Sequence, residues 1–271
     1  MFLKQLIDLI EKRIAPKEFH LNSEIYGLQY GKQDNCKVIK KVLLTIDLSL
    51  EAIHFGLKNK VNLIIAHHGL INRSIKYFNK NLINKLSLLT KFPISIFILN
   101  FPFIAAEGGI SDTLAEILYL QIDKTFDIIV NDNKRVPIGR ICLPRSYPNQ
   151  NGEIKLEDLI KRIKVNMELE YVSYIGNLKK KINKICIVGG DTPNREYIKE
   201  ALNYSCDCYI SGRLNYFDAI YARDNNLNVI EISYYKNVFL ALRKLVNILS
   251  LEFPYVEFLL FNSKDPYCVY F

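Results

Sequence analysis

Two adjacent histidines, His67 and His68, are the residues of this chain with the clearest potential for chemistry. They follow the apolar run 61–66 and precede Gly69, which predicts a buried strand that opens into a loop. Functional sites of α/β proteins gather at the carboxyl ends of strands. Successive side chains of a strand point to opposite faces, so both imidazoles reach one site only if the backbone leaves the extended form. The alternative is that the pair merely ends the strand, because histidines are often satisfied locally.

Asp47 ends another apolar strand, 38–47, and is the carboxylate that we expect nearest to the pair. The segments 38–47, 49–57 and 61–66 read as strand, helix and strand, which predicts a βαβ unit with parallel strands. Because their carboxyl ends share one edge, we expect Asp47 to lie within about 10 Å of an imidazole, in the range of a shared first or second shell. It is either a substitute metal ligand or a structural residue that binds backbone N–H groups.

The composition favours a folded soluble protein of one or two domains. The chain has 271 residues, of which 49% are hydrophobic and 24% charged. No run approaches the about 20 apolar residues of a membrane helix, and residues 1–14 form an amphipathic pattern rather than a signal peptide. The six cysteines form no CxxC motif, so we expect free, buried thiols and a cytoplasmic protein.

The basic residues give little support to nucleic-acid binding. The net charge is +8, but lysines and arginines are scattered, and the densest run is only Lys179–Lys181. A nucleic-acid footprint needs a basic face. The turn Gly189-Gly190 lacks the full patterns of nucleotide-binding loops, so we interpret it as a tight turn between strand and helix.

The order of the elements predicts an α/β fold with two related layers around parallel-rich mixed sheets. Ser49 and Ser111 are the expected caps of two helices. The main body comprises residues 1–130 and 175–271, and the central segment 131–174 is the candidate boundary region. We expect helices at 1–14, 49–57, 80–90, 112–120, 156–165, 196–202 and 239–251, and strands at 38–47, 61–66, 94–99, 139–143, 171–174, 182–188, 207–211, 229–232 and 255–260.

Eight short motifs, taken in order, resemble the Nif-three-like family, also known as GTP cyclohydrolase 1 type 2 homologues or dinuclear metal centre proteins. The resemblance spans nearly the whole chain and implies the Nif-three-like fold and a toroidal homo-hexamer. Each motif is weak alone, and their shared order makes the match specific. The motifs are Tyr26–Gly31, Thr45–Asp47, Ile65–Gly69, Ala105–Asp112, Gly139–Ile141, Val188–Gly190, Tyr209–Gly212 and Asp265–Pro266.

The resemblance also implies a ligand set, and this chain departs from it. Family members hold two metal ions with five side chains, and the adjacent histidines match His67 and His68. The family's aspartate falls on Ile104, and its later histidine and glutamate fall on Tyr234 and Val238. A further family histidine falls on Asn100. Carboxylates offset the charge of two divalent ions, and the aliphatic side chains at these positions ligate nothing.

Three classes of function follow. The first is a divergent family member with a reduced or lost dinuclear site that acts as a binding or scaffold protein. The second class, which is the alternative to it, is a metal-dependent hydrolase of a small nucleotide-like or cyclic substrate, with one zinc, iron or manganese ion on His67 and His68. The third is a partner of nucleic acid or of transcription. The sequence leaves open whether the chain is an enzyme, and we expect fewer than two bound ions per chain.

Two basic residues stand in the altered segments. Arg213 follows Ser211-Gly212 where the family carries an aspartate, and Lys236 lies in the degenerate Gly-His-Tyr segment. Side-chain cations can bind phosphate or carboxylate without a metal, arginine through a bidentate fork. We therefore expect a small anionic ligand at these residues, unless both side chains simply point to solvent.

Overall fold

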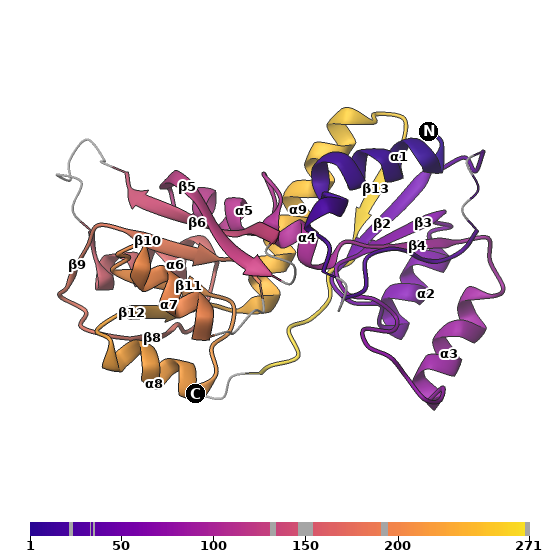
Figure 1. Cartoon of the computed structure of the whole chain (residues 1–271). Helices are drawn as coiled ribbons and strands as arrows, with labels where there is room; N and C mark the ends of the chain where they lie inside the picture. The colour runs from indigo at the N-terminus through magenta and orange to yellow at the C-terminus, as the bar shows by residue number, and fades with distance from the viewer. Residues whose placement is uncertain are drawn as a thin grey trace. The chain divides into compact units, whose positions relative to one another are not determined.

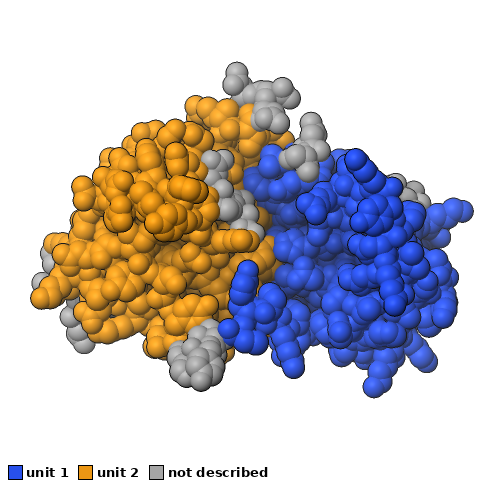
Figure 2. All heavy atoms as spheres, turned by 90° about the horizontal axis from the view of Figure 1, so that it is seen from below, with its two compact units in different colours: residues 1–103, 239–271 blue, residues 104–238 orange. Residues whose placement is uncertain are grey.

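The computed structural model describes residues 1–21, 24–32, 34, 36–130, 134–145, 154–190 and 195–268 (Figure 1). The chain forms two compact units, residues 1–103 with 239–271 and residues 104–238 (Figure 2). No described helix has both the length and the apolar character needed to cross a membrane. The mixed α/β architecture with parallel-rich sheets confirms the predicted fold class.

The first unit is built from five strands and their covering helices. Its strands are β1 (Gly27–Tyr30), β2 (Lys41–Thr45), β3 (Leu63–Ala66), β4 (Ser95–Ile98) and β13 (Glu257–Leu260). Its helical segments are α1 (Leu3–Leu9), a π-helical turn (Ile10–Ile14), a 3₁₀ turn (Lys17–Phe19), α2 (Leu50–Lys58), α3 (Lys80–Leu89) and most of α9 (Tyr234–Glu252).

The five strands lie in the order β1-β4-β3-β2-β13. Strands β13, β2, β3 and β4 are parallel, and β1 is an antiparallel edge. The parallel pairing of β2 with β3 through α2 confirms the predicted βαβ unit, and Ser49 caps α2 by accepting the N–H of Ala52 at 3.0 Å.

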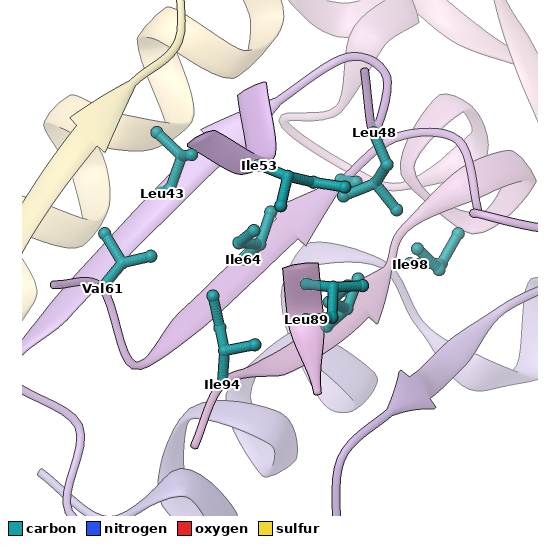
Figure 3. Packing of buried hydrophobic residues seen from close by; sticks show 10 residues of the cluster. Leu43, Leu48, Ile53, Val61, Ile64, Leu89, Ile94 and Ile98 are labelled. Atoms are coloured by element: carbon teal, nitrogen blue, oxygen red, sulfur yellow. The ribbon is translucent and has the colours of Figure 1, made fainter. Parts of the chain in front are cut away.

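Apolar side chains of this unit meet between the sheet and its helices (Figure 3). Parallel strands are covered on both faces, which is why their sequences are apolar runs without alternation. The cluster comprises Leu43, Leu48, Ile53, Val61, Ile64, Ala66, Leu89, Ile94, Ile96 and Ile98.

The second unit contains a six-stranded sheet, a two-stranded sheet and short helices. The strands are β5 (Leu120–Val130), β6 (Lys134–Pro144), β7 (Ile154–Lys155), β8 (Ser173–Ile175), β9 (Lys181–Ile182), β10 (Ile185–Val188), β11 (Cys208–Ser211) and β12 (Asn228–Glu231). The helices are α5 (Ile110–Ile117), α6 (Leu156–Asn166), α7 (Arg195–Asn203) and α8 (Tyr216–Asp224), and α4 (Asn100–Ala105) leads into the unit.

The large sheet has the order β5-β6-β10-β11-β12-β8, with β10, β11 and β12 parallel and the outer strands antiparallel. The chain passes between the units at 103/104 and 238/239, which differs from the expected boundary segment 131–174. That segment lies within the second unit, where β6 pairs with β10 and β8 pairs with β12 in the six-stranded sheet.

Several elements differ from the expectation. Helix α5 begins at Ile110 after Gly109, so Ser111 lies inside the helix and is not its cap. Strand β5 was not expected, because it is a sheet edge whose side chains are mostly exposed and do not alternate. Helix α8 buries only Asp218 and Ala222, so its sequence lacks the apolar stripe from which a helix is predicted.

Candidate functional site

The histidine pair continues directly from the carboxyl end of β3. The N–H of His67 donates to the carbonyl of Thr45 at 3.0 Å, and the N–H of His68 donates to that of Ile46 at 2.8 Å. The two ring centroids are 4.7 Å apart, with 47° between the ring planes. The two imidazoles are therefore neighbours, as a site that uses both of them requires.

Asp47 contacts one of the two rings. The Nδ1 of His68 lies 2.8 Å from the Oδ1 of Asp47, which confirms the expected proximity. The backbone turns here because the hydroxyl of Thr45 donates to the carbonyl of Asp47 at 3.0 Å. An ionised carboxylate only accepts, so Nδ1 of His68 carries the proton and Nε2 of a neutral ring holds the lone pair. Carboxylates that accept a hydrogen bond from a metal-binding histidine orient its ring in this way.

His67 is the buried member of the pair, with only 1% of its surface exposed. Burial lowers the pKa of His67 well below its usual value of 6.5, and the charge of neighbouring His68 lowers it further. The ring is therefore neutral near pH 7, which is the form of imidazole that ligates metals. The Phe103 ring lies 6.5 Å away on an apolar side of the site.

Gln29 holds the loop that follows the pair, a role that the sequence did not suggest. Its Oε1 accepts the N–H of Leu70 at 2.7 Å, and its Nε2 donates to the carbonyl of Ile71 at 2.8 Å. A Cβ on Gly69 would lie 2.9 Å from the Oε1 of Gln29. The glycine therefore lets the loop approach this amide closely.

Two further polar residues flank the pair. Asn100, which the resemblance matches to a family histidine, donates its backbone N–H to the carbonyl of His67 at 3.1 Å and its side-chain amide to the carbonyl of Ile25 at 2.9 Å. Glu24 lies close enough for His20 and His68 to lower its carboxyl pKa, but burial is the larger effect and the pKa is raised. Sequence reasoning missed Glu24, which lies two residues before Tyr26, the start of the Tyr26–Gly31 motif.

Ile104 and Val238, which the resemblance matches to the family's acidic ligands, belong to the second unit and are buried. Ile104 is 4% exposed and Val238 is fully buried. A Cβ on Gly190 would strike the Cδ1 of Ile104, so the isoleucine fills the space above this glycine. Gly212 packs against Tyr234, where a Cβ would lie 3.3 Å from the Cδ2 of the ring.

These residues do not fit a dinuclear metal centre. Neither Ile104 nor Val238 has a donor atom, and across the described parts of the chain no group of three or more His, Cys, Asp or Glu residues is arranged to hold a metal ion. Of the five positions that the resemblance assigns to the metal ions, His67 and His68 keep the imidazole donors.

The Gly189-Gly190 turn is occupied by protein contacts. The N–H of Gly189 donates to the hydroxyl of Ser111 at 3.0 Å, and the carbonyl of Gly189 accepts the amide of Asn237. The hydroxyl of Ser111 in turn donates to Ile138 at 2.8 Å. These contacts support the tight-turn interpretation, and Asp191, which follows the turn, lies outside the described residues.

A buried ion pair supports the loop before α5. Arg140 and Asp112 pair with one another, and their side chains are 4% and 9% exposed. The guanidinium also donates to the carbonyls of Ala105 and Ala106 at 3.2 and 3.0 Å, and Asp112 accepts the N–H of Gly108 at 2.6 Å. This pair explains the Gly139–Ile141 motif as a structural support.

The two candidate cations have different surroundings. The Nζ of Lys236 lies 3.0 Å from the carboxylate of Glu168, so its charge is locally offset. Arg213 is exposed. Burial raises the carboxyl pKa of nearby Glu231, and the charge of Arg213 opposes this increase without cancelling it. Of the two, Arg213 is the more exposed residue and Lys236 is half-buried, so Arg213 is the more accessible candidate for an anionic ligand.

Comparison with known proteins decides the family. The family model Duf34/NIF3 (NGG1p interacting factor 3) matches residues 1–266. This chain belongs to the DUF34/NIF3 family. The NIF3 chain is 26% identical over 271 residues to a GTP cyclohydrolase 1 type 2 homolog of Clostridium perfringens, covering 98% of this chain and 99% of the relative. It is 27% identical over 251 residues to a homolog of Methanocaldococcus jannaschii, covering 92% and 95% of the two chains.

The fold of this NIF3 chain is also that of solved structures. A Bacillus cereus protein related to NIF3 superposes with a TM-score of 0.83 at 18% identity, covering 100% of this chain and 99% of that one. HcgD from Methanocaldococcus jannaschii superposes with a TM-score of 0.79 at 24% identity, covering 97% and 98%. These likenesses establish the Nif-three-like fold.

Proposed function

We propose that this NIF3-family chain is a binding protein whose dinuclear metal centre is reduced to its two histidines. The observation that carries the proposal is Ile104, which is 4% exposed and fills the space above Gly190. An aspartate there would place a charge in an apolar environment, which is unfavourable without a paired cation. The isoleucine is therefore a packed part of the unit.

The remaining donors favour at most one divalent ion. Two divalent cations need anionic ligands to offset their charge, and the imidazoles of His67 and His68 are neutral ligands. Asp47 is engaged with the Nδ1 of His68 at 2.8 Å, which suits an orienting role better than that of a bridging ligand. Loss of the second ion removes the chemistry that two metals perform together.

A second candidate function is a metal-dependent hydrolase of a small nucleotide-like or cyclic substrate. The observation that favours it is the pairing of Asp47 with His68, because a carboxylate bonded to one ring nitrogen is the arrangement that orients histidines toward a metal ion such as zinc, iron or manganese. Such an ion would supply Lewis-acid chemistry when bound. The chain's own part would be to keep the buried His67 ring neutral and to orient the His68 ring through Asp47.

The ligand that we propose for the binding function is a small anion held by Arg213. Its guanidinium is exposed at the carboxyl end of β11, where the hydroxyl of Ser211 donates to the Arg213 carbonyl at 3.0 Å. The net charge of +8 favours anionic ligands in general. The relatives' name motivates GTP as one probe, and inorganic phosphate tests the anion alone.

Calorimetric titration with GTP and with phosphate, with and without a chelator, tests the proposal. We expect binding that survives the chelator and weakens at least about tenfold, or 1.4 kcal/mol, in Arg213→Ala. The matched control is Arg223→Ala, an exposed arginine of the same unit that pairs with Asp224, which should bind normally.

Other outcomes reject it. Binding that disappears with the chelator, together with metal-dependent turnover of GTP, supports the hydrolase instead. Absence of binding to either probe contradicts the anion proposal outright. The homo-oligomer implied by the family resemblance remains a separate proposal, which light scattering tests as a multiple of the 31.5 kDa chain mass.

A further inference from the structure

Residues 72–80, between β3 and α3, form a continuous exposed segment of the first unit. Each of its ends is fixed by an asparagine. The Oδ1 of Asn72 accepts the N–H of Gly69 at 2.8 Å, and the Oδ1 of Asn79 accepts the N–H of Leu82 at 2.9 Å in the first turn of α3. In Figure 1, α3 lies below the labelled strands of this unit, and the segment enters its lower end. The segment is therefore an anchored stretch of surface.

Large apolar side chains are concentrated in this segment. Ile75, Tyr77 and Phe78 are 44%, 79% and 60% exposed. Ile83, which is 49% exposed, lies on α3 three residues after Lys80, so these two side chains share one helix face. Apolar side chains that are exposed singly are common, but a group of them marks an interaction site.

The charge of the segment has a single sign. Residues 52–106 contain seven lysines and arginines and no aspartate or glutamate, and three of the seven, Arg73, Lys76 and Lys80, lie in the segment. The ion pairs within the described part of the first unit involve other cations, and they join Arg13 with Glu252, Lys41 with Glu257 and His68 with Asp47. The surface that carries the apolar side chains is therefore positively charged.

The remaining basic residues of this stretch lie away from the segment. Lys58 and Lys60 precede β3, whereas the segment follows that strand. Lys91 precedes β4, which is parallel to β3, so it belongs to the same end of the sheet as Lys58. Lys85 is half-buried. Lys58 and Lys60 therefore provide a control pair of exposed lysines at the opposite end of the strand.

We propose that the segment 72–80 docks on a membrane surface that is rich in anionic lipids. Its lysine and arginine side chains bind the headgroups, and its apolar side chains enter the boundary between headgroups and acyl chains. A lipid boundary accepts isoleucine as well as tyrosine or phenylalanine, whereas single-stranded nucleic acid is held by stacking of bases on aromatic rings. The exposed isoleucines, Ile75 and Ile83, therefore favour the membrane. The segment shares no residue with the candidate anion site at Arg213, so the two can be tested separately.

Vesicle binding tests the proposal on the full chain. We expect the chain to cosediment with vesicles of equal parts phosphatidylserine and phosphatidylcholine, and not with vesicles of phosphatidylcholine alone. Lys76→Glu with Lys80→Glu should weaken this binding at least about twentyfold, since each basic residue near an anionic membrane contributes about fivefold. Lys58→Glu with Lys60→Glu makes the same change of charge at the other end of β3. Because exposed charges separated by more than about 8 Å are largely screened at physiological salt, this control should bind within about threefold of the wild type.

A fluorescent reporter tests whether the apolar side chains enter the lipid. The chain has no tryptophan, so Phe78→Trp supplies a single reporter. Its emission should shift to shorter wavelength with the phosphatidylserine vesicles, because the ring leaves water for the membrane interface. Tyr255→Trp is the matched control, since Tyr255 is 97% exposed and precedes β13, and its emission should not shift.

A further variant separates the apolar contribution from the charge. Tyr77→Ser with Phe78→Ser keeps every cation and should still weaken binding at least about tenfold, because it removes two apolar side chains that the lipid would bury. Circular dichroism checks that the variants are folded. Equal binding to both kinds of vesicle, or an unshifted emission of Phe78→Trp, would overturn the proposal. It would equally be overturned if the wild type ignored vesicles and the segment instead held a single-stranded oligonucleotide, or if Tyr77→Ser with Phe78→Ser only changed the oligomeric mass in light scattering.

Discussion

The Nδ1 of His68 lies 2.8 Å from the Oδ1 of Asp47, so a carboxylate fixes the orientation of one of the two site histidines. Because the carboxylate can only accept, the proton of a neutral His68 resides on Nδ1. We expect nitrogen NMR of the wild-type chain to show this tautomer. Asp47→Ala should shift the His68 proton toward Nε2, whereas the ring of exposed His54 should not change. The same His68 tautomer in both proteins would refute the orienting role.

Ile104 and Gly190 offer a test of how closely the side chain of Ile104 packs over this glycine. Gly190→Ala should destabilise the chain by about 1–3 kcal/mol, because its new methyl group meets the Cδ1 of Ile104. Ile104→Val removes that atom, so Gly190→Ala should be milder in the Ile104→Val background. Urea denaturation of both single variants and the double variant gives the coupling, which should exceed about 0.5 kcal/mol. Additive effects would mean that the contact is absent.

The buried pair of Arg140 and Asp112 should matter more than any surface pair of the unit. Arg140→Met leaves the carboxylate of Asp112 buried without its cation, which costs about 3–5 kcal/mol of unfolding free energy. Arg223→Met is the control, since Arg223 pairs with Asp224 at the surface, and it should change stability by under about 1 kcal/mol. Equal effects in chemical denaturation would contradict the supporting role of Arg140.

The buried thiols predict a loss of stability in alkali. Burial raises the pKa of Cys142 from its usual 9 to about 12. A group whose folded pKa is raised contributes stability that is complete below its unfolded pKa and is lost as pH rises through the folded one. The unfolding free energy should therefore fall between about pH 9 and 12, by up to about 1.4 kcal/mol per pH unit for this thiol. Cys142→Ala should flatten the decline, and Cys36→Ala, at an exposed cysteine, should leave it unchanged.

The sequence predicts those parts of the fold whose side chains are periodic or uniformly apolar. The run 61–66 predicts β3, because a strand that is covered on both faces needs apolar residues throughout. Ser49 predicts the start of α2, because its side chain caps the helix. Strand β5 lacks such a signal, since it is an exposed edge. Ser111 resembles a cap but faces two backbone groups inside the unit, a contact that only the tertiary fold creates.

The candidate site divides in the same way. The proximity of Asp47 to His68 follows from the parallel pairing of β2 and β3, which the βαβ pattern predicts. The hydrogen bond from Leu70 to Gln29, which supports the loop after His68, joins residues 41 positions apart in the sequence. No local sequence pattern therefore predicts it. The pairing of Lys236 with Glu168 likewise depends on two segments that only the fold brings together.

Metal content tests the central claim most directly. The purified chain is dialysed against zinc, manganese or iron without chelator, freed of unbound ions, and analysed for bound metal by mass spectrometry. The absence of donor atoms at Ile104 and Val238 predicts fewer than two ions per chain, and His67→Ala with His68→Ala should abolish any ion that remains. Two tightly held ions per chain would contradict the account and would show that other carboxylates complete the centre.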